Sequence, residues 1–321
     1  MNEFWNNYPD LKIELQSVNR IIEDSLKDSE TYILHTTKET INSGGKMLRP
    51  AFVLLGSKFG TYSESNILNI AAIVEMLHIA TLIHDDIIDN SKLRRGVESI
   101  QSKYGKDTAV FIGDYLFAKC FSLITKDYSK ESMNQLSKAI LNICRGELKQ
   151  YSFRYKYNFS IMNYLRIITG KTAALFSMSL YIGAEETDVD FKVKKLLSKI
   201  GYRVGMAFQI IDDCLDYSKK SIIKKNNMND LKQGYLTLPV IYALQNDSTG
   251  NLKQVLTTCT YTEHEIEQIH TLVIKNNGLE DAKKLALKYT NKAFEAIKKL
   301  PDTNNKNILK EIITQLLNRQ Y

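Results

Sequence analysis

Proline is scarce in this chain of 321 residues, and its distribution is uneven. The four prolines are Pro9, Pro50, Pro239 and Pro301, so none falls between residues 51 and 238. Because proline disrupts helix interiors, a long proline-free stretch with apolar residues at helical spacing predicts an all-α fold. The length alone would allow one large domain or two ordinary ones. No Gly-, Pro- or Ser-rich linker divides the chain, so we expect a single domain over residues 1–321.

Cysteine is equally scarce, and segments for export or membrane insertion are not evident. The four cysteines are far apart and form no Cys-x-x-Cys pair, which favours a reduced, cytoplasmic protein. The residues Met-Asn-Glu-Phe-Trp-Asn-Asn at the start lack the basic and apolar regions of a signal peptide. The most apolar long segment, Ile67 to Ile83, is interrupted by Asn69, Glu75 and His78, so we do not expect it to span a membrane.

Blocks of like charge are also missing. The formal net charge of +7 comes from scattered lysines, with no arginine-rich arm, so nucleic acid is not an expected partner. A weak preference for anionic substrates or membrane surfaces is compatible with this balance.

Two copies of one acidic pattern stand out against this background. Asp-Asp-x-x-Asp occurs at residues 85–89 and again at residues 212–216, each time directly after an apolar run. At average aspartate usage the pattern is expected by chance about 0.04 times in this length. A single copy could be a solvated helix face, but two copies favour function. If both runs are helical, the first and fifth residues share a face, and such carboxylates need cations to neutralise them. Mg²⁺ prefers this arrangement, bridging carboxylates to substrate phosphates.

Helix boundaries can be predicted around these patterns. Ser63 is an expected N-cap for a helix from residue 64 to about residue 90, which is apolar on nearly every side and therefore belongs at the centre of a bundle. Thr262 and Glu265 form the pattern of a capping box for a later helix. Segments with cations suited to phosphate accompany the acidic patterns, although each alone is weak evidence. They are Gly44–Pro50, Leu93–Gly96, Lys171–Phe176 and Lys219–Lys232.

Taken together, the motifs resemble those of the trans-polyprenyl diphosphate synthases, a family of head-to-tail isoprenoid chain elongation enzymes. In family order they are GGKMLRP, MLHIATLIHDDIID, LRRG, GDYLFA, GELKQ, GKTAALF, GMAFQIIDDCLDY and NDLKQGYLTLP, covering about residues 40 to 240. The stretch from Lys156 to Ala173 is most similar to the large, catalytic component of hexaprenyl or heptaprenyl diphosphate synthases. The resemblance implies a helical bundle around a central cavity.

The resemblance also implies roles for individual residues. It assigns up to three Mg²⁺ ions per site to Asp85, Asp86, Asp89, Asp212, Asp213 and Asp216. It assigns the allylic diphosphate to Arg94, Lys171 and a lysine of the later loop, and isopentenyl diphosphate to Lys46, Arg49, His78 and Arg95. Thr172 and Gln209 would stabilise the allylic cation through their oxygen dipoles. His78 alone could equally be a core histidine, but it lies seven residues before Asp85 and shares its helix face.

The later loop departs from the family pattern. The family has Gly-Lys after the second acidic motif, whereas this chain has Lys224-Lys225 in a shorter segment. Lys225 is the best match for the diphosphate-binding lysine, and Lys220 and Lys224 remain alternatives.

Product length depends in this family on residues before the first aspartate. Large aromatic residues four or five positions earlier stop growth, but here those positions hold Thr81 and Ala80, with Leu77 a turn deeper. We therefore expect an all-trans product beyond C20, of C30 to C35, for quinone side chains. Alternatively, these small residues only fit a crowded helix contact, and the enzyme makes C15 to C20 products.

Two rival functions share parts of this pattern. A terpene cyclase would not need the isopentenyl site at GGKMLRP and Arg95. A non-catalytic partner subunit would be expected to lose its acidic motifs, and here both are whole. The resemblance further implies a homodimer or a heteromer with a small regulatory subunit, and peripheral membrane contact for product release.

Overall fold

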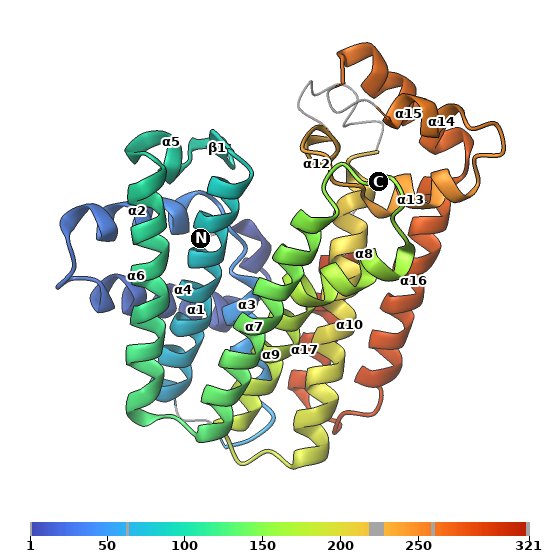
Figure 1. The fold of residues 1–321 in the computed structure, drawn as a ribbon. Helices are drawn as coiled ribbons and strands as arrows, with labels where there is room; N and C mark the ends of the chain where they lie inside the picture. Colours follow the sequence, from blue (N-terminus) through green and yellow to red (C-terminus); the bar gives the residue numbers. More distant parts are fainter. Residues whose placement is uncertain (1, 62–63, 218–227, 258–260, 319–321) are drawn as a thin grey trace. The chain divides into compact units, whose positions relative to one another are not determined.

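The computed structural model describes residues 2–61, 64–217, 228–257 and 261–318, and almost all of its regular structure is helical (Figure 1). By their contacts these residues divide into two compact units. Unit 1 comprises residues 1–136 and 179–197, and unit 2 comprises residues 137–178 and 198–321. The prediction of an all-α fold is confirmed. A single domain with a central cavity stays a prediction.

Unit 1 contains most of the first half of the chain. Its elements are η1 (Glu3–Trp5), α1 (Pro9–Ser25), α2 (Thr31–Asn42), α3 (Leu48–Ser57), α4 (Glu64–Ile88), β1 (Leu93–Arg94), β2 (Val97–Glu98), α5 (Ile100–Tyr104) and α6 (Lys106–Asp127). The first residues of α7 (Lys130–Ser152) and of α10 (Phe191–Leu215) and the second half of α9 (Ala174–Glu185) complete it.

Unit 2 contains the rest of α7, α9 and α10 and the later helices. These are α8 (Ile161–Ile168), η2 (Thr169–Ala173), α12 (Asn229–Lys232), α13 (Leu238–Gln245), α14 (Asn251–Leu256), α15 (Glu263–Lys275), α16 (Gly278–Ile297) and α17 (Asn304–Leu317). The predicted capping box of Thr262 and Glu265 is present at the start of α15, with both of its hydrogen bonds. Within the unit, α13 packs against α16 and α15.

The prolines lie where a helix tolerates them. Pro9, Pro50 and Pro239 each fall in the first turn of a helix, α1, α3 and α13, where the missing N–H would have no intrahelical partner. The long proline-free stretch therefore leaves α4, α6, α7 and α10 uninterrupted over 22 to 25 residues each.

Helix α4 is the core of unit 1, as its all-round apolar sequence predicts. It packs against α1, α3 and α6 (Figure 1), and its residues from Ile70 to Leu77 are buried without a gap. It begins at Glu64, while the predicted cap Ser63 lies outside the described residues. It ends at Ile88, two residues before the expected end.

The end of α4 has a clear physical cause. Asn90 adopts a left-handed backbone conformation (φ 50°), which asparagine tolerates better than most residues. The N–H of Ser91 then donates to the Asp86 carbonyl, and the N–H of Asn90 donates to the Ile87 carbonyl. These two bonds form a Schellman motif, which closes the helix and places Asp89 at its C-terminal cap.

Three helical stretches of the described residues are long and apolar enough, by length and composition, to cross a membrane. They are Asn66–Ile88, Lys106–Thr125 and Ile161–Glu185, of which 72%, 33% and 78% are buried within the protein. Composition alone therefore does not exclude α4 as a span, contrary to the expectation from its polar residues. Its packing against α1, α3 and α6 supports the core role instead.

Candidate active site

Each acidic motif lies at the C-terminal end of a helix. The first occupies the last turn of α4 in unit 1 and the second the last turn of α10 in unit 2, and in each case the fifth residue, Asp89 or Asp216, directly follows the helix. That the two motifs face one another across a common site stays a prediction.

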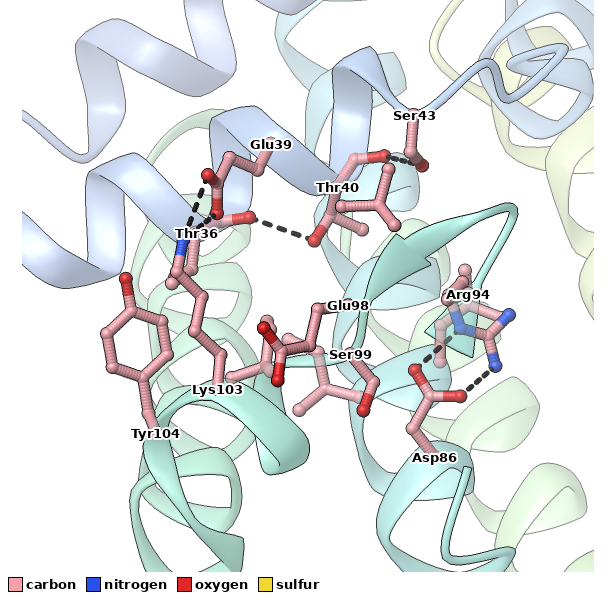
Figure 2. A pocket seen from close by; sticks show the side chains of 14 residues that line it. Thr36, Glu39, Thr40, Ser43, Asp86, Arg94, Glu98, Ser99, Lys103 and Tyr104 are labelled. Carbon is pink, nitrogen blue, oxygen red and sulfur yellow. Dashed lines mark hydrogen bonds and ion pairs between the residues drawn. The ribbon is translucent and has the colours of Figure 1, made fainter. Parts of the chain in front are cut away.

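In unit 1, Asp86 is paired with a guanidinium from the neighbouring hairpin. The carboxylate is buried, and Arg94 donates to it from two nitrogens: Nε lies 2.7 Å from Oδ2 and Nη2 lies 2.6 Å from Oδ1 (Figure 2). Such a bidentate pair is among the stronger charged contacts in proteins. Asp85 is half-buried on the same helix. The predicted metal ligand Asp86 and the predicted diphosphate ligand Arg94 are thus brought together.

The hairpin that carries Arg94 was not predicted. Strands β1 and β2 pair antiparallel, Leu93 with Glu98 and Arg94 with Val97. The two residues between them, Arg95 and Gly96, both have positive φ (52° and 81°), as a type I′ turn requires. A left-handed arginine is strained, and strained backbone concentrates at functional sites. Because the strands on both sides of the turn are paired, the backbone position of Arg95 is fixed.

Three of the four residues predicted for isopentenyl diphosphate, Arg49, His78 and Arg95, cluster in unit 1. Arg49 donates from Nη1 to His78 Nε2 at 2.9 Å, so this nitrogen of the imidazole is an acceptor. Burial, followed by the charges of Arg49, Arg95 and Arg94, holds the pKa of His78 well below its ordinary value. The histidine is therefore neutral at physiological pH and able to accept this bond. Burial lowers the pKa of Arg49 to about 10, which still leaves it charged.

Glu75 belongs to this cluster, although it was not among the predicted site residues. Burial raises its pKa to about 7, against the opposing effect of Arg49 and Arg95. Glu75 and His78 are three residues apart on α4 and so share a face. Two polar residues three positions apart in an otherwise apolar helix are the feature of the sequence that could have identified Glu75 as a site residue.

The N-terminal segment fixes the turn that precedes α3. Trp5 is completely buried and donates from Nε1 to the Lys46 carbonyl at 2.7 Å, and Asn2 donates to the Gly44 carbonyl at 3.1 Å. The ammonium of Lys46 lies 5.0 Å above the Phe4 ring. These contacts, unforeseen from the sequence, hold the predicted phosphate-binding turn in place.

Gly45 leaves room for Arg95. A Cβ atom at this position would lie 2.4 Å from Arg95 Nη1, closer than side-chain carbons come to other atoms. The glycine and the arginine of two separate motifs are therefore matched in shape.

This match predicts the effect of one methyl group. Gly45→Ala should displace the Arg95 guanidinium and raise the KM for isopentenyl diphosphate by roughly 10- to 100-fold, because a charged hydrogen bond contributes about 1.5–3 kcal/mol. Steady-state kinetics check this, with the allylic KM as the internal reference. If the effect runs through Arg95, the double variant Gly45→Ala/Arg95→Ala should be no worse than Arg95→Ala alone. Additive losses would contradict the link.

In unit 2, Lys171 and Thr172 lie in a turn of π-helix. Element η2 joins α8 to α9, and such π turns occur often at functional sites. A Cβ on Gly170 would lie 2.4 Å from the Asn142 carbonyl oxygen, so this turn approaches the α7 backbone very closely. At the same contact Lys171 Nζ lies 3.0 Å from Glu147 Oε1. Glu147, from the motif GELKQ, was not assigned a role from the sequence.

Four side chains of unit 2 form a hydrogen-bonded chain. Thr172 Oγ1 donates to Gln209 Oε1 at 2.8 Å, and Gln209 Nε2 donates to Asp213 Oδ1 at 2.9 Å. The Tyr164 hydroxyl donates to the other oxygen of Asp213 at 2.6 Å. The structure therefore brings three predicted site residues together. Tyr164 was missed, because no spacing along the chain connects it to the second acidic motif.

The second acidic motif is crowded with carboxylates. Burial and the charge of Asp230 raise the pKa of Asp213 to about 8, and the same causes raise that of Asp216 to about 7. Burial also raises the pKa of Asp230, against the lowering effect of Lys171. Asp230 lies in the motif NDLKQGYLTLP but was not among the predicted site residues. Carboxyl groups that resist ionisation together are suited to a cation that would neutralise them.

The residues predicted to control product length are described by the structure, but the lysines of the later loop are not. Leu77 and Ala80 are completely buried, whereas Thr81 is half-buried and its hydroxyl donates to the His78 carbonyl at 2.7 Å. Lys225 and its alternatives Lys220 and Lys224 lie outside the described residues. Among the residues that are described, no three His, Cys, Asp or Glu side chains converge closely enough to form a metal cage by themselves.

The helical architecture, with two acidic motifs flanked by cations, defines an isoprenoid synthase of the prenyltransferase class. Residues 30–273 match the family model described as polyprenyl synthetase. The chain is 33% identical over 315 residues to heptaprenyl diphosphate synthase component 2 of Bacillus subtilis (strain 168), covering 98% of this chain and 90% of that protein. The chain belongs to the polyprenyl synthetase family.

Two solved structures of the family are similar over nearly their whole length. The geranylgeranyl pyrophosphate synthase of Lactobacillus brevis ATCC 367 has a TM-score of 0.92 and 31% identity, covering 99% of both chains. A polyprenyl synthase of Caulobacter crescentus CB15, complexed with calcium and isoprenyl diphosphate, has a TM-score of 0.89 and 30% identity, covering 97% of this chain and 96% of that one.

Proposed function

We propose that the protein condenses isopentenyl diphosphate head-to-tail with an allylic diphosphate, in a Mg²⁺-dependent reaction. The observation that carries this proposal is that carboxylates and cations lie close together in each unit. Asp86 is paired with Arg94 in unit 1, and Lys171 contacts Glu147 and lies within electrostatic range of Asp230 in unit 2. Carboxylates and cations side by side are what a metal-bridged diphosphate requires.

The donor set fits a divalent ion. Mg²⁺ binds through one or two carboxylates, water and substrate phosphates rather than through a closed protein cage. The proposed ligands are Asp85, Asp86 and Asp89 in the first motif and Asp212, Asp213 and Asp216 in the second, for up to three ions. When bound, Mg²⁺ would neutralise the charge that develops on the leaving diphosphate. The Caulobacter crescentus relative, complexed with calcium and isoprenyl diphosphate, supports the use of a divalent ion.

The side chains of this protein would bind and orient the two substrates. Arg94 and Lys171 would hold the allylic diphosphate as its C–O bond breaks. The cluster of Lys46, Arg49, His78 and Arg95 would hold isopentenyl diphosphate, whose double bond forms the new C–C bond. The proton lost afterwards would pass to the released diphosphate, so no side-chain nucleophile is required.

We further propose a product longer than C20, of C30 to C35, for quinone side chains. The support is the small residues before Asp85 and the similarity to a heptaprenyl diphosphate synthase component. A C15 to C20 product is the alternative, and the similarity to a geranylgeranyl pyrophosphate synthase keeps it open. Intact acidic motifs argue against a non-catalytic partner subunit.

A partner for the chain is part of this proposal. Val110, Phe111 and Phe121 on α6 are 37%, 70% and 44% exposed, which is unusual for large apolar side chains on one helix. They would suit a homodimer or a small regulatory subunit, and the name "component 2" of the Bacillus subtilis relative points to the second possibility. We place the enzyme in the cytoplasm, with peripheral membrane contact for product release.

The reaction class is tested with the purified chain, labelled isopentenyl diphosphate and farnesyl diphosphate. Transfer of label into an acid-labile product should depend on added Mg²⁺ and disappear with a chelator. A product formed from farnesyl diphosphate without isopentenyl diphosphate would indicate a cyclase instead.

The pair between Arg94 and Asp86 predicts how metal binding depends on diphosphate. Because the guanidinium already neutralises Asp86, Arg94→Gln should bind Mn²⁺ in the absence of diphosphate about tenfold more tightly than the wild type, a change of about 1.4 kcal/mol. Free Mn²⁺ measured by electron paramagnetic resonance gives the affinity. Arg95→Gln, which removes the same charge from the next residue, is the matched control and should change the affinity little. Equal effects of both variants would contradict a specific pair.

A further inference from the structure

A hydrogen-bonded chain in unit 2 has a defined direction. It runs from Thr172 through Gln209 and Asp213 to Tyr164, with donor–acceptor distances of 2.8, 2.9 and 2.6 Å. Thr172, Asp213 and Tyr164 are buried, and Gln209 is half-buried. Few alternative partners are therefore available to these groups.

The carboxylate of Asp213 sets that direction. Asp213 Oδ1 accepts from Gln209 Nε2, so the Gln209 amide turns its NH₂ group towards Asp213. Its carbonyl oxygen then faces Thr172 and takes the hydroxyl proton of that residue. The lone pairs of the Thr172 oxygen are left free for another contact.

If the Gln209 amide could rotate, Thr172 would no longer present the lone pairs of its oxygen as an acceptor. With its NH₂ group towards Thr172, Gln209 would donate to the Thr172 oxygen, and the hydroxyl proton would point away from Gln209. The group offered by Thr172 would change from an acceptor to a donor. Since a developing allylic cation is stabilised only by the negative end of a dipole, the two orientations differ in their effect on the reaction.

Tyr164 restrains the carboxylate on which this depends. Its hydroxyl holds Oδ2 of Asp213, while Gln209 holds Oδ1, so both oxygens are fixed. Tyr164 is on α8, and Asp213 and Gln209 are on α10 one turn apart. The tyrosine therefore couples the helix before the π turn to the helix with the second acidic motif.

We propose that Tyr164 is a positioning residue, which acts through Asp213 to keep Gln209 and Thr172 oriented with their oxygens available to the allylic cation. This rests on the proposed function for its catalytic consequence. The restraint on Gln209 itself is a property of the folded chain and can be measured without substrate.

The variant Tyr164→Phe removes only the hydroxyl and keeps the ring, so its packing is retained. It should lower kcat by about 10- to 100-fold, the scale of a misplaced catalytic group, with both KM values unchanged within about twofold. The affinity for Mn²⁺ in the presence of inorganic diphosphate should also stay within about twofold of the wild type.

Tyr217→Phe is the matched control. Tyr217 is buried, lies four residues after Asp213 and hydrogen-bonds Thr237 at 3.3 Å, but no bond joins it to Asp213. It should retain kcat within about twofold. An unchanged kcat in Tyr164→Phe, or a fall in kcat matched by an equal loss of Mn²⁺ affinity, would overturn the positioning role.

A second readout separates this inference from the proposed function. In protein labelled with ¹⁵N-glutamine, the Gln209 side-chain amide can be assigned by its loss in Gln209→Leu. Its hydrogen exchange should be slow in the wild type and in Tyr217→Phe, and at least about tenfold faster in Tyr164→Phe. Unchanged exchange would refute the restraint. An inactive wild type with protected Gln209 would refute the proposed function and leave the restraint standing.

Discussion

Alanine at Asp85 or at Asp212 is expected to lower kcat by roughly 10³-fold or more, at the upper end of the effects seen when one preorganised electrostatic group is removed. Each substitution removes the first carboxylate of one acidic motif, and with it a proposed ligand for the ion that neutralises the leaving diphosphate. Each leaves the hydrogen-bonded pairs of the second carboxylate, those of Asp86 with Arg94 and of Asp213 with Tyr164, in place. The loss should therefore reflect chemistry rather than unfolding.

Initial rates with labelled isopentenyl diphosphate, measured at saturating Mg²⁺, check this expectation. Asp302→Ala is a suitable control, because that aspartate is 97% exposed and paired only at the surface with Lys306. It should retain wild-type activity. Activity near that of the wild type in either motif variant would remove the metal-bridged diphosphate from the mechanism.

Phenylalanine at position 81 or 80 is expected to shorten the product to C15 to C20. Thr81 lies one turn before Asp85, about 6 Å along the helix, and shares its face. It is half-buried, whereas Ala80 is completely buried, so Thr81 is the better placed of the two to border the growing chain. Phenylalanine at Ala80 also risks overpacking, at a cost of about 1–3 kcal/mol.

Chromatography of the dephosphorylated products measures the change in length. Thr81→Val is the control for the hydroxyl that bonds the His78 carbonyl, and it should leave the product length as in the wild type. Long products from a folded, active Thr81→Phe enzyme would mean that the chain follows another route. The basis for a product beyond C20 would then be lost.

Local patterns in the sequence predicted much of this structure. The spacing of prolines and apolar residues gave the all-α fold, and the apolar run before Asp85 gave α4 and its central place in unit 1. The capping box at Thr262 was correct, because it depends on residues three positions apart. Arg49, His78 and Arg95, three of the residues predicted for isopentenyl diphosphate, do lie together, whereas their role stays a prediction.

What the sequence did not predict depends on contacts between distant segments. Arg95 occupies a turn position with positive φ, where glycine or asparagine is usual. The sequence of the hairpin therefore lacks the ordinary signal of a turn at this position. The π turn at Lys171 lies where Gly170 closely approaches the α7 backbone, a contact between segments far apart in the sequence. Tyr164 reaches Asp213 across 49 positions of sequence. The role of Lys225 remains a prediction, since it lies outside the described residues.

The most direct test of the central claim is the product of the wild-type chain itself. The purified protein is incubated with Mg²⁺, farnesyl diphosphate and labelled isopentenyl diphosphate, alone and with a candidate small subunit, and the dephosphorylated products are separated by length. We predict all-trans products of C30 to C35, formed by the chain alone or on addition of the subunit. Products that stop at C20 would contradict the long-chain assignment, and no transfer of isopentenyl units under either condition would contradict the proposed function.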